Sequence, residues 1–378
     1  MDNIKEFHLH YGAGKLSIGL LLPSFIKSGI IHGVIQRPSN DFDTIIFPNS
    51  PRFIYLNDIK YRIITNLSDL NISNQDFNSE NLFIYTNSDT ELFNYMNSVA
   101  TSISTSIGPD FKYFKNINFR QSINIFAAEN NFNDINELSI KLKNKCNVFQ
   151  CMIDRICTDR SIFRSNLNQN IVFVRTESFK GEIILPKSIK KIPFSGENVH
   201  RCKSDLEFNY LYKRKMIFVN GIHTNIAFII LSKIKEKIII QEDRLQKPFS
   251  QISLKLDEDE LYILKIWITA RKLFLLDLFD VKKVYECEDE SNLIDILFEY
   301  SNNCLNRILD TPDNLGRILG GGVVRRYSER IKPIINFINE LPNYNLNNTQ
   351  MLVLNKSNLK FEQLYQIINN FSVPCLDI

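Results

Sequence analysis

The first part of the chain alternates between short β-prone runs and stretches with helical spacing of apolar residues. Phe7–Tyr11 is a β-prone run, Leu16–Phe25 places apolar residues at helical spacing, and Ile30–Ile35 is again β-prone. Further strand-like runs occur at Tyr61–Thr65, Leu82–Tyr85, Ala100–Ser106, Ile123–Phe126 and Val148–Met152. Strands that alternate with helices predict an α/β unit with a mainly parallel, doubly wound sheet.

Beyond about residue 190 the pattern becomes helical. Apolar residues recur at helical spacing in Phe208–Ser232, Asp257–Leu278, Asn292–Leu309, Tyr327–Asn339 and Lys360–Asn370. The stretch Pro186–Gly196, which contains proline and lysine, separates the two patterns. A chain of 378 residues is longer than one hydrophobic core usually serves. We therefore expect two domains, residues 1–190 with the sheet and residues 191–378 mainly helical.

A glycine turn joins the first predicted strand to the first predicted helix. Gly12 and Gly14 have the GxG spacing that lets a backbone approach a pyrophosphate at a helix N-terminus. The third glycine of GxGxxG is absent, since Ser17 occupies its place and Gly19 follows two residues later. An ordinary glycine turn is the alternative. The position after the first strand favours a Rossmann-type dinucleotide site with Gly12, Gly14 and Ser17 as cofactor-binding candidates.

The end of the second predicted strand bears on the choice of cofactor. Gln36 stands where such sheets usually place an acid that binds the adenosine ribose, and Arg37 follows it. Without the acid there is no repulsion against a 2′-phosphate, and the Arg37 guanidinium could bind one. This favours NADP slightly over NAD. Arg37 is equally compatible with a solvated loop position.

Composition and charge narrow the class of protein. A net charge of +3 gives no reason to expect a nucleic acid or an acidic membrane as the main partner. The seven cysteines form no CxxC pair, which is typical of reduced thiols. The N-terminus does not resemble a secretory signal, and we find no uninterrupted run of about 20 apolar residues. We expect a cytoplasmic protein that acts on a small molecule.

Three polar residues interrupt the strongly apolar segment Lys213–Asn225. On an α-helix Lys215, Asn220 and His223 would lie within an arc of about 140°. Buried polar groups are costly unless they have a partner or a role. A lysine in an apolar pocket can act as a base toward an alcohol, and a nearby amide can stabilise charge on the reacting oxygen. Taken singly, Lys215 could be a solvated lysine and His223 a satisfied core histidine.

The spacing K-x4-N-x2-H resembles the signature of the polyol-specific long-chain dehydrogenases, a family that uses no metal. Other segments are similar to motifs of that family and follow in its order: His10–Gly14 (HYGAG), Ser106–Pro109 (SIGP), Asn124–Asn130 (NIFAAEN), Ile153–Ile156 (IDRI), Thr176–Phe179 (TESF) and Ser328–Pro333 (SERIKP). These matches span about residues 8 to 333. The chain length is similar to the mannitol-1-phosphate 5-dehydrogenase branch.

The resemblance implies a role for each matching residue. Lys215 would be the general acid and base, and Asn130 and Asn220 would hold the reacting oxygen. His223 would orient the substrate, and Asp154 would support the site or contact a substrate hydroxyl. The implied reaction interconverts a polyol and a ketose, or their phosphates, with NAD or NADP and without a metal.

The substrate is less well specified than the reaction. A sugar phosphate such as mannitol 1-phosphate or fructose 6-phosphate would need basic partners, for which Lys213, Arg214, Arg317, Arg325 and Arg326 are candidates, Arg317 foremost. Surface charge explains these residues equally well. The same chemistry on a hexuronate or another hydroxylated metabolite is the second possibility. A dinucleotide-binding protein without turnover is a third.

Several positions depart from the family pattern. Besides Ser17 and Gln36, Glu182 stands where the family has Trp, and Asn131 and Glu329 also differ. These departures put the substrate in doubt more than the reaction. The run Gly320–Gly322 could suggest a phosphate loop. It lacks the GKS/T ending and no clear strand precedes it, so we expect a flexible connection.

Overall fold

The computed structural model describes residues 6–46, 51–64, 81–86, 90–114, 117, 122–130, 132–187, 189, 191–238, 240–287, 289–341 and 346–376. The chain divides into two compact units, Met1–Phe208 and Asn209–Ile378. We expected the division after residue 190. It falls later because strand β13 (Val199–Arg201) still pairs with β12 (Glu182–Leu185) of the first unit.

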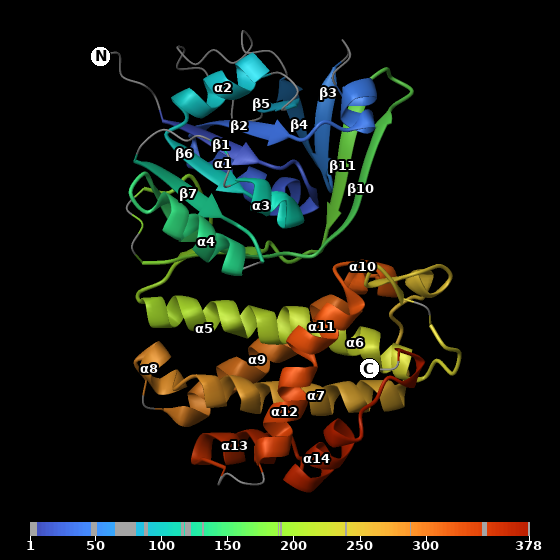
Figure 1. Ribbon diagram of the computed structural model, residues 1–378. Helices are drawn as coiled ribbons and strands as arrows, with labels where there is room; N and C mark the ends of the chain where they lie inside the picture. Colours follow the sequence, from blue (N-terminus) through green and yellow to red (C-terminus); the bar gives the residue numbers. More distant parts are fainter. Residues whose placement is uncertain are drawn as a thin grey trace. The chain divides into compact units, whose positions relative to one another are not determined.

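The first unit is built on a ten-stranded, mainly parallel sheet (Figure 1). Its strands are β1 (Phe7–Tyr11), β2 (Ile31–Gln36), β3 (Arg52–Leu56), β4 (Ile59–Ile64), β5 (Asn81–Thr86), β6 (Ser102–Thr105), β7 (Ile123–Ala127), β8 (Cys146–Gln150), β10 (Cys157–Arg164) and β11 (Asn170–Thr176). The order β5-β2-β1-β6-β7-β8 is the 3-2-1-4-5-6 order of a Rossmann-type sheet. The predicted fold class is therefore confirmed.

Two antiparallel strand pairs extend this sheet beyond β5. They are β3 with β4 and β10 with β11, and β11 joins β3 in parallel. A smaller sheet, β13-β12-β9, contains β9 (Met152–Asp154). The sequence analysis predicted none of β3, β10 and β11.

Helices cover both faces of the large sheet. Helix α1 (Leu22–Ser28) packs through Phe25 into one apolar cluster, together with Val34 and Phe126 of the sheet. On the other face α2 (Thr90–Val99), α3 (Phe111–Phe114) and α4 (Phe132–Leu142) pack against a second cluster. Alternate residues of β1 point to opposite faces, so Leu9 and Tyr11 join the second cluster. The doubly wound arrangement is confirmed.

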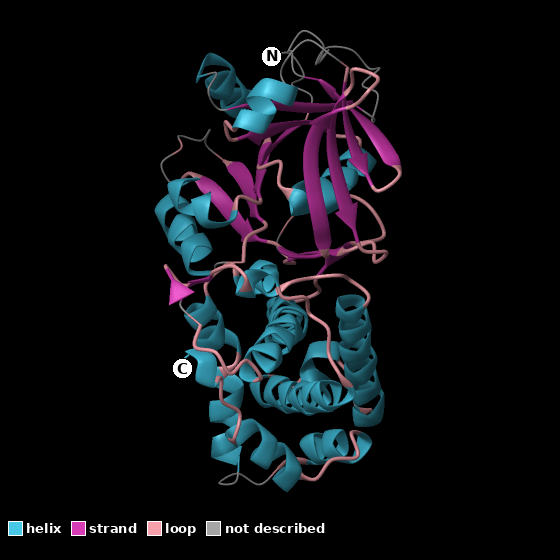
Figure 2. Ribbon diagram, turned by 90° about the vertical axis from the view of Figure 1, so that its right-hand side faces the viewer, coloured by secondary structure: helices cyan, strands magenta, loops and turns pink. Residues whose placement is uncertain are grey.

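The second unit is helical, as predicted (Figure 2). Its described helices include α6 (Gly221–Ser232), α7 (Glu258–Leu278), α8 (Val281–Tyr285), α9 (Glu290–Leu309), α10 (Leu315–Leu319), α11 (Val323–Arg330), α12 (Lys332–Glu340), α13 (Asn348–Lys356) and α14 (Phe361–Asn369). Helix α5 (Asp205–Lys215) begins at the end of the first unit and leads into α6 through a π-helical turn, η5 (Met216–Asn220).

The segment predicted as one helix at Tyr327–Asn339 is two helices. Helix α11 ends at Arg330, and α12 begins at Lys332 with Pro333 in its first turn. Pro333 has no backbone N–H, so a hydrogen bond of a continuous helix would be missing there. The single-helix prediction was wrong at this point.

One helical stretch in the part of the chain that the structure describes, Asp205–Ser232, is long and apolar enough to cross a membrane. Because 78% of its apolar window is buried within the protein, it has the character of a core helix.

Candidate functional site

The glycine turn lies at the carboxyl edge of the sheet, after β1. Gly12 has a φ of 108°, and a Cβ there would lie 2.9 Å from the Ser106 carbonyl oxygen. Only glycine fits such a conformation so close to a neighbouring backbone. A Cβ on Gly14 would have nothing within 4 Å. The turn therefore has no free space beside Gly12 and is open at Gly14. This geometry fits the close approach of a pyrophosphate.

The missing third glycine has a structural replacement. The helix that follows the turn contains a π-helical segment, Ser17–Leu21, and within it Gly19 packs closely on the sheet. A Cβ on Gly19 would lie 2.7 Å from the Cys157 Sγ and 2.9 Å from the Thr176 Cγ2. Gly19 thus allows the close helix–sheet packing that the third glycine normally allows. Ser17 is buried, and its hydroxyl has no hydrogen-bond partner among the described residues.

Gln36 and Arg37 lie at the end of β2, beside this turn. The Gln36 side-chain oxygen accepts a hydrogen bond from the Ala13 backbone N–H at 3.1 Å. Gln36 therefore lies next to the glycine turn, as the ribose-binding acid of a Rossmann-type site would. The exposed Arg37 forms an ion pair with Asp110. That partner, which the sequence pattern did not indicate, competes with any 2′-phosphate for the guanidinium.

Glu129 is a residue of this edge that the sequence reasoning missed. Its buried carboxylate accepts hydrogen bonds from the backbone N–H groups of Ile107 (2.8 Å) and Gly108 (2.9 Å). Burial raises the pKa of Glu129 to about 7. The carboxylate joins the end of β7 to the turn after β6. Asn130, the predicted catalytic amide, follows it and is exposed. The sequence did contain a signal for Glu129, because this acid is part of the segment NIFAAEN.

Residues of two further motifs, IDRI and TESF, form contacts within the first unit. Arg155 donates a hydrogen bond to the Gly19 carbonyl, and Glu177 accepts one from the Ile156 N–H at 2.5 Å. Asp154 is buried in β9 and lies opposite Glu182 of β12 in an antiparallel pair. Glu182, which stands where the polyol-specific dehydrogenases have Trp, is thus a strand residue. Asn131 lies outside the described residues.

In the second unit the π-helical turn changes the alignment of the predicted catalytic residues. A π turn holds one more residue than an α turn, so later residues are rotated back by about 100°. Lys215 and His223 then lie within about 20° of each other around the helix axis, and Asn220 within about 60° of both. Lys215 and His223 are buried, at 6% and 8% exposure. The three residues therefore lie on one narrow face of the helix.

A buried arginine holds the π turn in place. Arg271 of α7 is 1% exposed and donates hydrogen bonds to the Asn225 Oδ1 (2.6 Å), the Ile217 carbonyl (3.2 Å) and the Arg330 carbonyl (2.9 Å). Burial lowers its pKa to about 9. A Cβ on Gly221 would lie 2.4 Å from the Arg271 Nη1. The glycine of the VNGIH segment is therefore required by the passage of this side chain.

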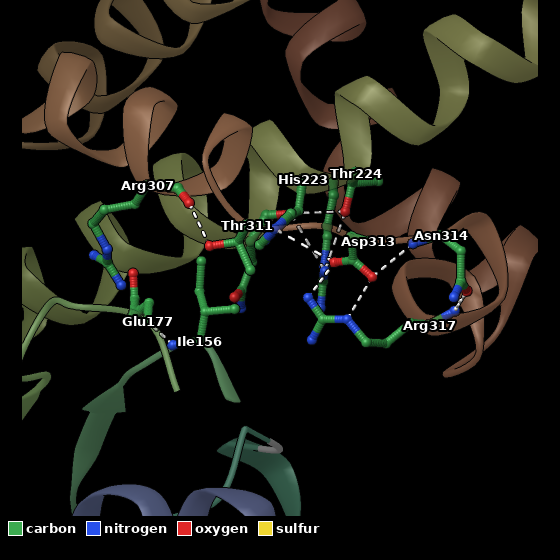
Figure 3. A network of polar contacts seen from close by, with 11 residues as sticks. Ile156, Glu177, His223, Thr224, Arg307, Thr311, Asp313, Asn314 and Arg317 are labelled. Carbon is green, nitrogen blue, oxygen red and sulfur yellow. Dashed lines mark hydrogen bonds and ion pairs between the residues drawn. The ribbon is translucent and has the colours of Figure 1, made fainter. Parts of the chain in front are cut away.

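His223 is a neutral imidazole beside an arginine–aspartate pair (Figure 3). Burial, followed by the charges of four arginines, lowers its pKa to about 3. Its Nε2 lies 3.8 Å from the Asp313 carboxylate and has no hydrogen-bond partner among the described residues. Arg317 binds the same carboxylate through two nitrogens. The predicted substrate residue Arg317 is thus engaged with Asp313.

Four arginines act electrostatically on His223: Arg307, Arg317, Arg326 and Arg330. Arg326 and Arg330 each keep a buried Nε–H without a hydrogen-bond partner in the described chain. Arg330 also donates to the Thr224 hydroxyl at 3.1 Å. Of the other basic candidates Arg214 is buried, with its guanidinium 3.8 Å from the Tyr300 ring centre. The usable positive charge near His223 therefore comes from α11.

The run Gly320–Gly322 leads into α11, whose N-terminus is already occupied. The Asp243 carbonyl accepts from the Val323 N–H (2.9 Å), and its carboxylate accepts from the Val324 N–H (2.6 Å). These N–H groups are therefore not available to a phosphate. The phosphate-loop alternative is wrong.

Comparisons with known proteins add little to this geometry. No family model and no curated protein matches the sequence. Similar solved structures include 2-dehydropantoate 2-reductase from Porphyromonas gingivalis W83, at 9% identity and a TM-score of 0.42 over 96% of this chain and 98% of that chain. D-Mandelate dehydrogenase with NADH and anilino(oxo)acetate has 12% identity and a TM-score of 0.41, over 98% of this chain and 100% of that chain. Glycerol-3-phosphate dehydrogenase from Coxiella burnetii has 12% identity and a TM-score of 0.41, over 98% and 97%.

These identities are too low for any activity of those proteins to be transferred to this chain. None of the three is a mannitol-phosphate dehydrogenase. The polyol resemblance therefore stays a prediction.

Proposed function

We propose that this protein is a metal-independent, nicotinamide-dinucleotide-dependent oxidoreductase that interconverts a secondary alcohol and a ketone on an anionic, hydroxylated substrate. The observation that carries the proposal is the narrow polar face on a buried helix, where the π turn aligns Lys215, Asn220 and His223. Lys215 and His223 are buried, and burying polar groups costs free energy that a role in the reaction would account for.

The first unit would bind the dinucleotide. Gly12 and Gly14 form a turn that is open toward an approaching pyrophosphate, at the strand order where such sheets bind nucleotides. Ser17 lies in the helix that follows, and its hydroxyl has no partner in the described chain. Gln36, which lies beside the turn, would bind a ribose hydroxyl, and Arg37 would bind a 2′-phosphate if Asp110 releases it. A bound nicotinamide would accept or supply the hydride.

The second unit would supply acid–base chemistry. Lys215 would take the alcohol proton during oxidation and return it to the ketone oxygen during reduction. The Asn220 side chain, which donates to the Met216 sulfur at 2.9 Å, would exchange that weak bond for one to the reacting oxygen. His223, neutral throughout the physiological range, would hold a substrate hydroxyl. Asn130 would serve as a second amide, and Asp154 as a buried support.

The surroundings of His223 favour a negatively charged substrate. Arg326 and Arg330 have unused N–H donors there, and the Glu329 carboxylate offsets part of their charge. A phosphate or carboxylate on the substrate would pair with these guanidinium groups. We therefore place a polyol phosphate and its ketose phosphate first, with a hexuronate second. An uncharged polyol fits these arginines less well.

A substrate screen tests the proposal. The protein is mixed with NADH or NADPH and a set of ketoses, ketose phosphates and hexuronates, and dinucleotide oxidation is followed by absorbance. We expect turnover on an anionic member, reduced at least 100-fold by Lys215→Met with unchanged dinucleotide affinity. Lys213→Met, an exposed lysine of the same helix, is the matched control. Dinucleotide binding without turnover on any substrate would favour the non-catalytic alternative, and full activity of Lys215→Met would exclude the proposed acid–base role.

A further inference from the structure

A row of histidines and serines crosses the core of the first unit. His8 and His10 alternate along β1, and Ser102, Ser104 and Ser106 alternate along and just beyond β6. The two strands are parallel neighbours, with His8 opposite Ser102 and His10 opposite Ser104. All five side chains therefore lie on the same face of the sheet. This is the face that α1 covers, where Phe25 packs against both imidazoles at 4.7 and 5.3 Å.

These side chains form one continuous hydrogen-bonded chain. The His8 Nδ1 lies 2.8 Å from the Ser102 hydroxyl, and the His8 Nε2 lies 2.8 Å from the Ser104 hydroxyl. The His10 Nδ1 lies 2.6 Å from the same Ser104 hydroxyl, and the His10 Nε2 lies 3.1 Å from Ser106. His8, His10 and Ser104 are fully buried. Every ring nitrogen of the two histidines has a hydroxyl partner.

The shared hydroxyl couples the two imidazoles. Burial lowers the pKa of His10 to about 3 and that of His8 well below its usual value, so each ring is neutral and carries one N–H. Ser104 has one proton and can donate to only one of its two ring neighbours. If it donates to the His10 Nδ1, it must accept from the His8 Nε2–H, and the reverse holds for the other direction. Both histidines then adopt the same tautomer.

A ligand at the glycine turn would select one of these two directions. Ser106, at the end of the chain beside the turn, is the hydroxyl partner of the His10 Nε2. If Ser106 donates to a ligand, it accepts from the His10 Nε2–H. His10 then accepts from Ser104, Ser104 from His8, and His8 from Ser102, so that all the N–H and O–H bonds of the chain point toward the turn.

We propose that Ser102–His8–Ser104–His10 is a cooperative hydrogen-bond chain that an anionic group at the glycine turn, the pyrophosphate of the dinucleotide, orients by accepting a hydrogen bond from Ser106. The Ser106 carbonyl lies at the Gly12 turn, and β1 and β6 are the two strands between which the strand order reverses. The orientation of the chain rests on the proposed dinucleotide site, whereas the shared tautomer of the two histidines does not.

The tautomers can be read directly in the full chain by ¹⁵N–¹H correlation spectra of protein with ¹⁵N-labelled histidine. The chain has five histidines, so His8→Gln and His10→Gln variants assign the two signals. We expect the two imidazoles in the same tautomer in the protein without nucleotide, and both as Nε2–H tautomers once a dinucleotide is bound. Ser104→Ala removes the shared hydroxyl and should change the signals of both rings. Unlike tautomers without nucleotide, or two Nδ1–H rings with it, would overturn the proposal.

The donor role of Ser106 is tested by titrating NADH and NADPH into variants. Ser106→Ala should weaken the preferred dinucleotide about tenfold, as expected for one hydrogen bond to a charged group. Ser106→Thr keeps the hydroxyl and should restore most of the affinity. Ser98→Ala, an exposed serine of α2, is the control and should bind like the wild type.

Wild-type affinity in Ser106→Ala would overturn the donor role. If the wild-type protein bound neither dinucleotide, the proposed function and the pyrophosphate assignment would both fail. The tautomers of the protein without nucleotide would still decide whether the two histidines are coupled through Ser104.

Discussion

Substituting Gly221 by alanine tests how the second unit holds its polar helix face. The added Cβ would lie 2.4 Å from the Arg271 Nη1 and 2.6 Å from its Cζ, closer than real contacts allow. The end of an arginine side chain is usually free to move. Here the guanidinium is fixed by hydrogen bonds to Asn225 and to two backbone carbonyls, those of Ile217 and Arg330.

The magnitude follows from these contacts. Displacing the guanidinium breaks two or three charge-assisted hydrogen bonds, each contributing about 1.5 kcal/mol, so the loss is about 3–5 kcal/mol. Alanine in a helix gains about 1 kcal/mol over glycine. The contacts outweigh the propensity, and we expect a net loss of about 2–4 kcal/mol, or roughly 10 °C in melting temperature for a unit of this size.

A double-mutant cycle isolates the cause. Thermal unfolding is measured for Gly221→Ala, Arg271→Met and the double variant, with Gly14→Ala as a control because its Cβ would meet nothing within 4 Å. In the Arg271→Met background the flexible thioether can move, and Gly221→Ala should become neutral or slightly stabilising. Gly14→Ala should change stability by less than about 0.5 kcal/mol.

The reasoning is refuted if Gly221→Ala is as stable as the wild type. It is also refuted if the substitution costs the same in both backgrounds, since the loss would then have nothing to do with Arg271.

Three further predictions follow from the structure. Asp110→Asn removes the carboxylate that binds Arg37, so affinity for NADPH should rise several-fold relative to NADH; an unchanged ratio of the two dissociation constants would show that Arg37 does not meet a 2′-phosphate. Glu129→Gln keeps one acceptor for two backbone N–H groups, so the free energy of unfolding measured in urea should fall by about 1–3 kcal/mol. An unchanged free energy would contradict the role of Glu129 in joining β7 to the turn after β6. Burial lowers the pKa values of His10 and His223 to about 3 and that of His32 to about 4, while the unfolded chain binds these protons near pH 6.5. Stability should therefore fall as the pH drops from 6.5 toward 4, and a flat melting profile over that range would contradict the neutral, buried imidazoles.

The sequence predicted the parts of the fold that obey simple periodicity. The residues of β1, of the helix after it and of β2 have the spacing expected of a strand, a helix and a strand. The βαβ unit and the glycine turn were therefore recognisable in the sequence. Strands β3, β10 and β11 were not predicted, and the parallel pairing of β11 with β3 joins strands far apart in the sequence, which no local pattern indicates. The break at Ile331 was missed because the helical pattern continues through Pro333.

The candidate site was predictable in its residue types and not in its geometry. Lys215, Asn220 and His223 stand out because they interrupt an apolar helix, but only the π turn brings them onto one narrow face. No local sequence pattern predicts that π turn. The turn is held by Arg271, which lies about 50 residues further along the chain and fills the space beside Gly221. Partners of this kind are set by tertiary packing.

The histidine–serine chain was visible only in part. The H-x-H and S-x-S-x-S spacings place the side chains on one face of each strand, which period two already implies. That the two strands are neighbours in register is a property of the sheet order.

Dinucleotide binding by the wild-type protein and by Gly14→Val is the measurement that tests the central claim most directly. Titration of NADH and NADPH by calorimetry should show one saturable site per chain for at least one of them. The valine side chain would fill the open space at the turn, so binding should weaken at least 30-fold while the melting temperature stays within a few degrees. Absence of saturable binding to either dinucleotide, or equal affinity in the two proteins, would contradict the assignment of the glycine turn as a cofactor site.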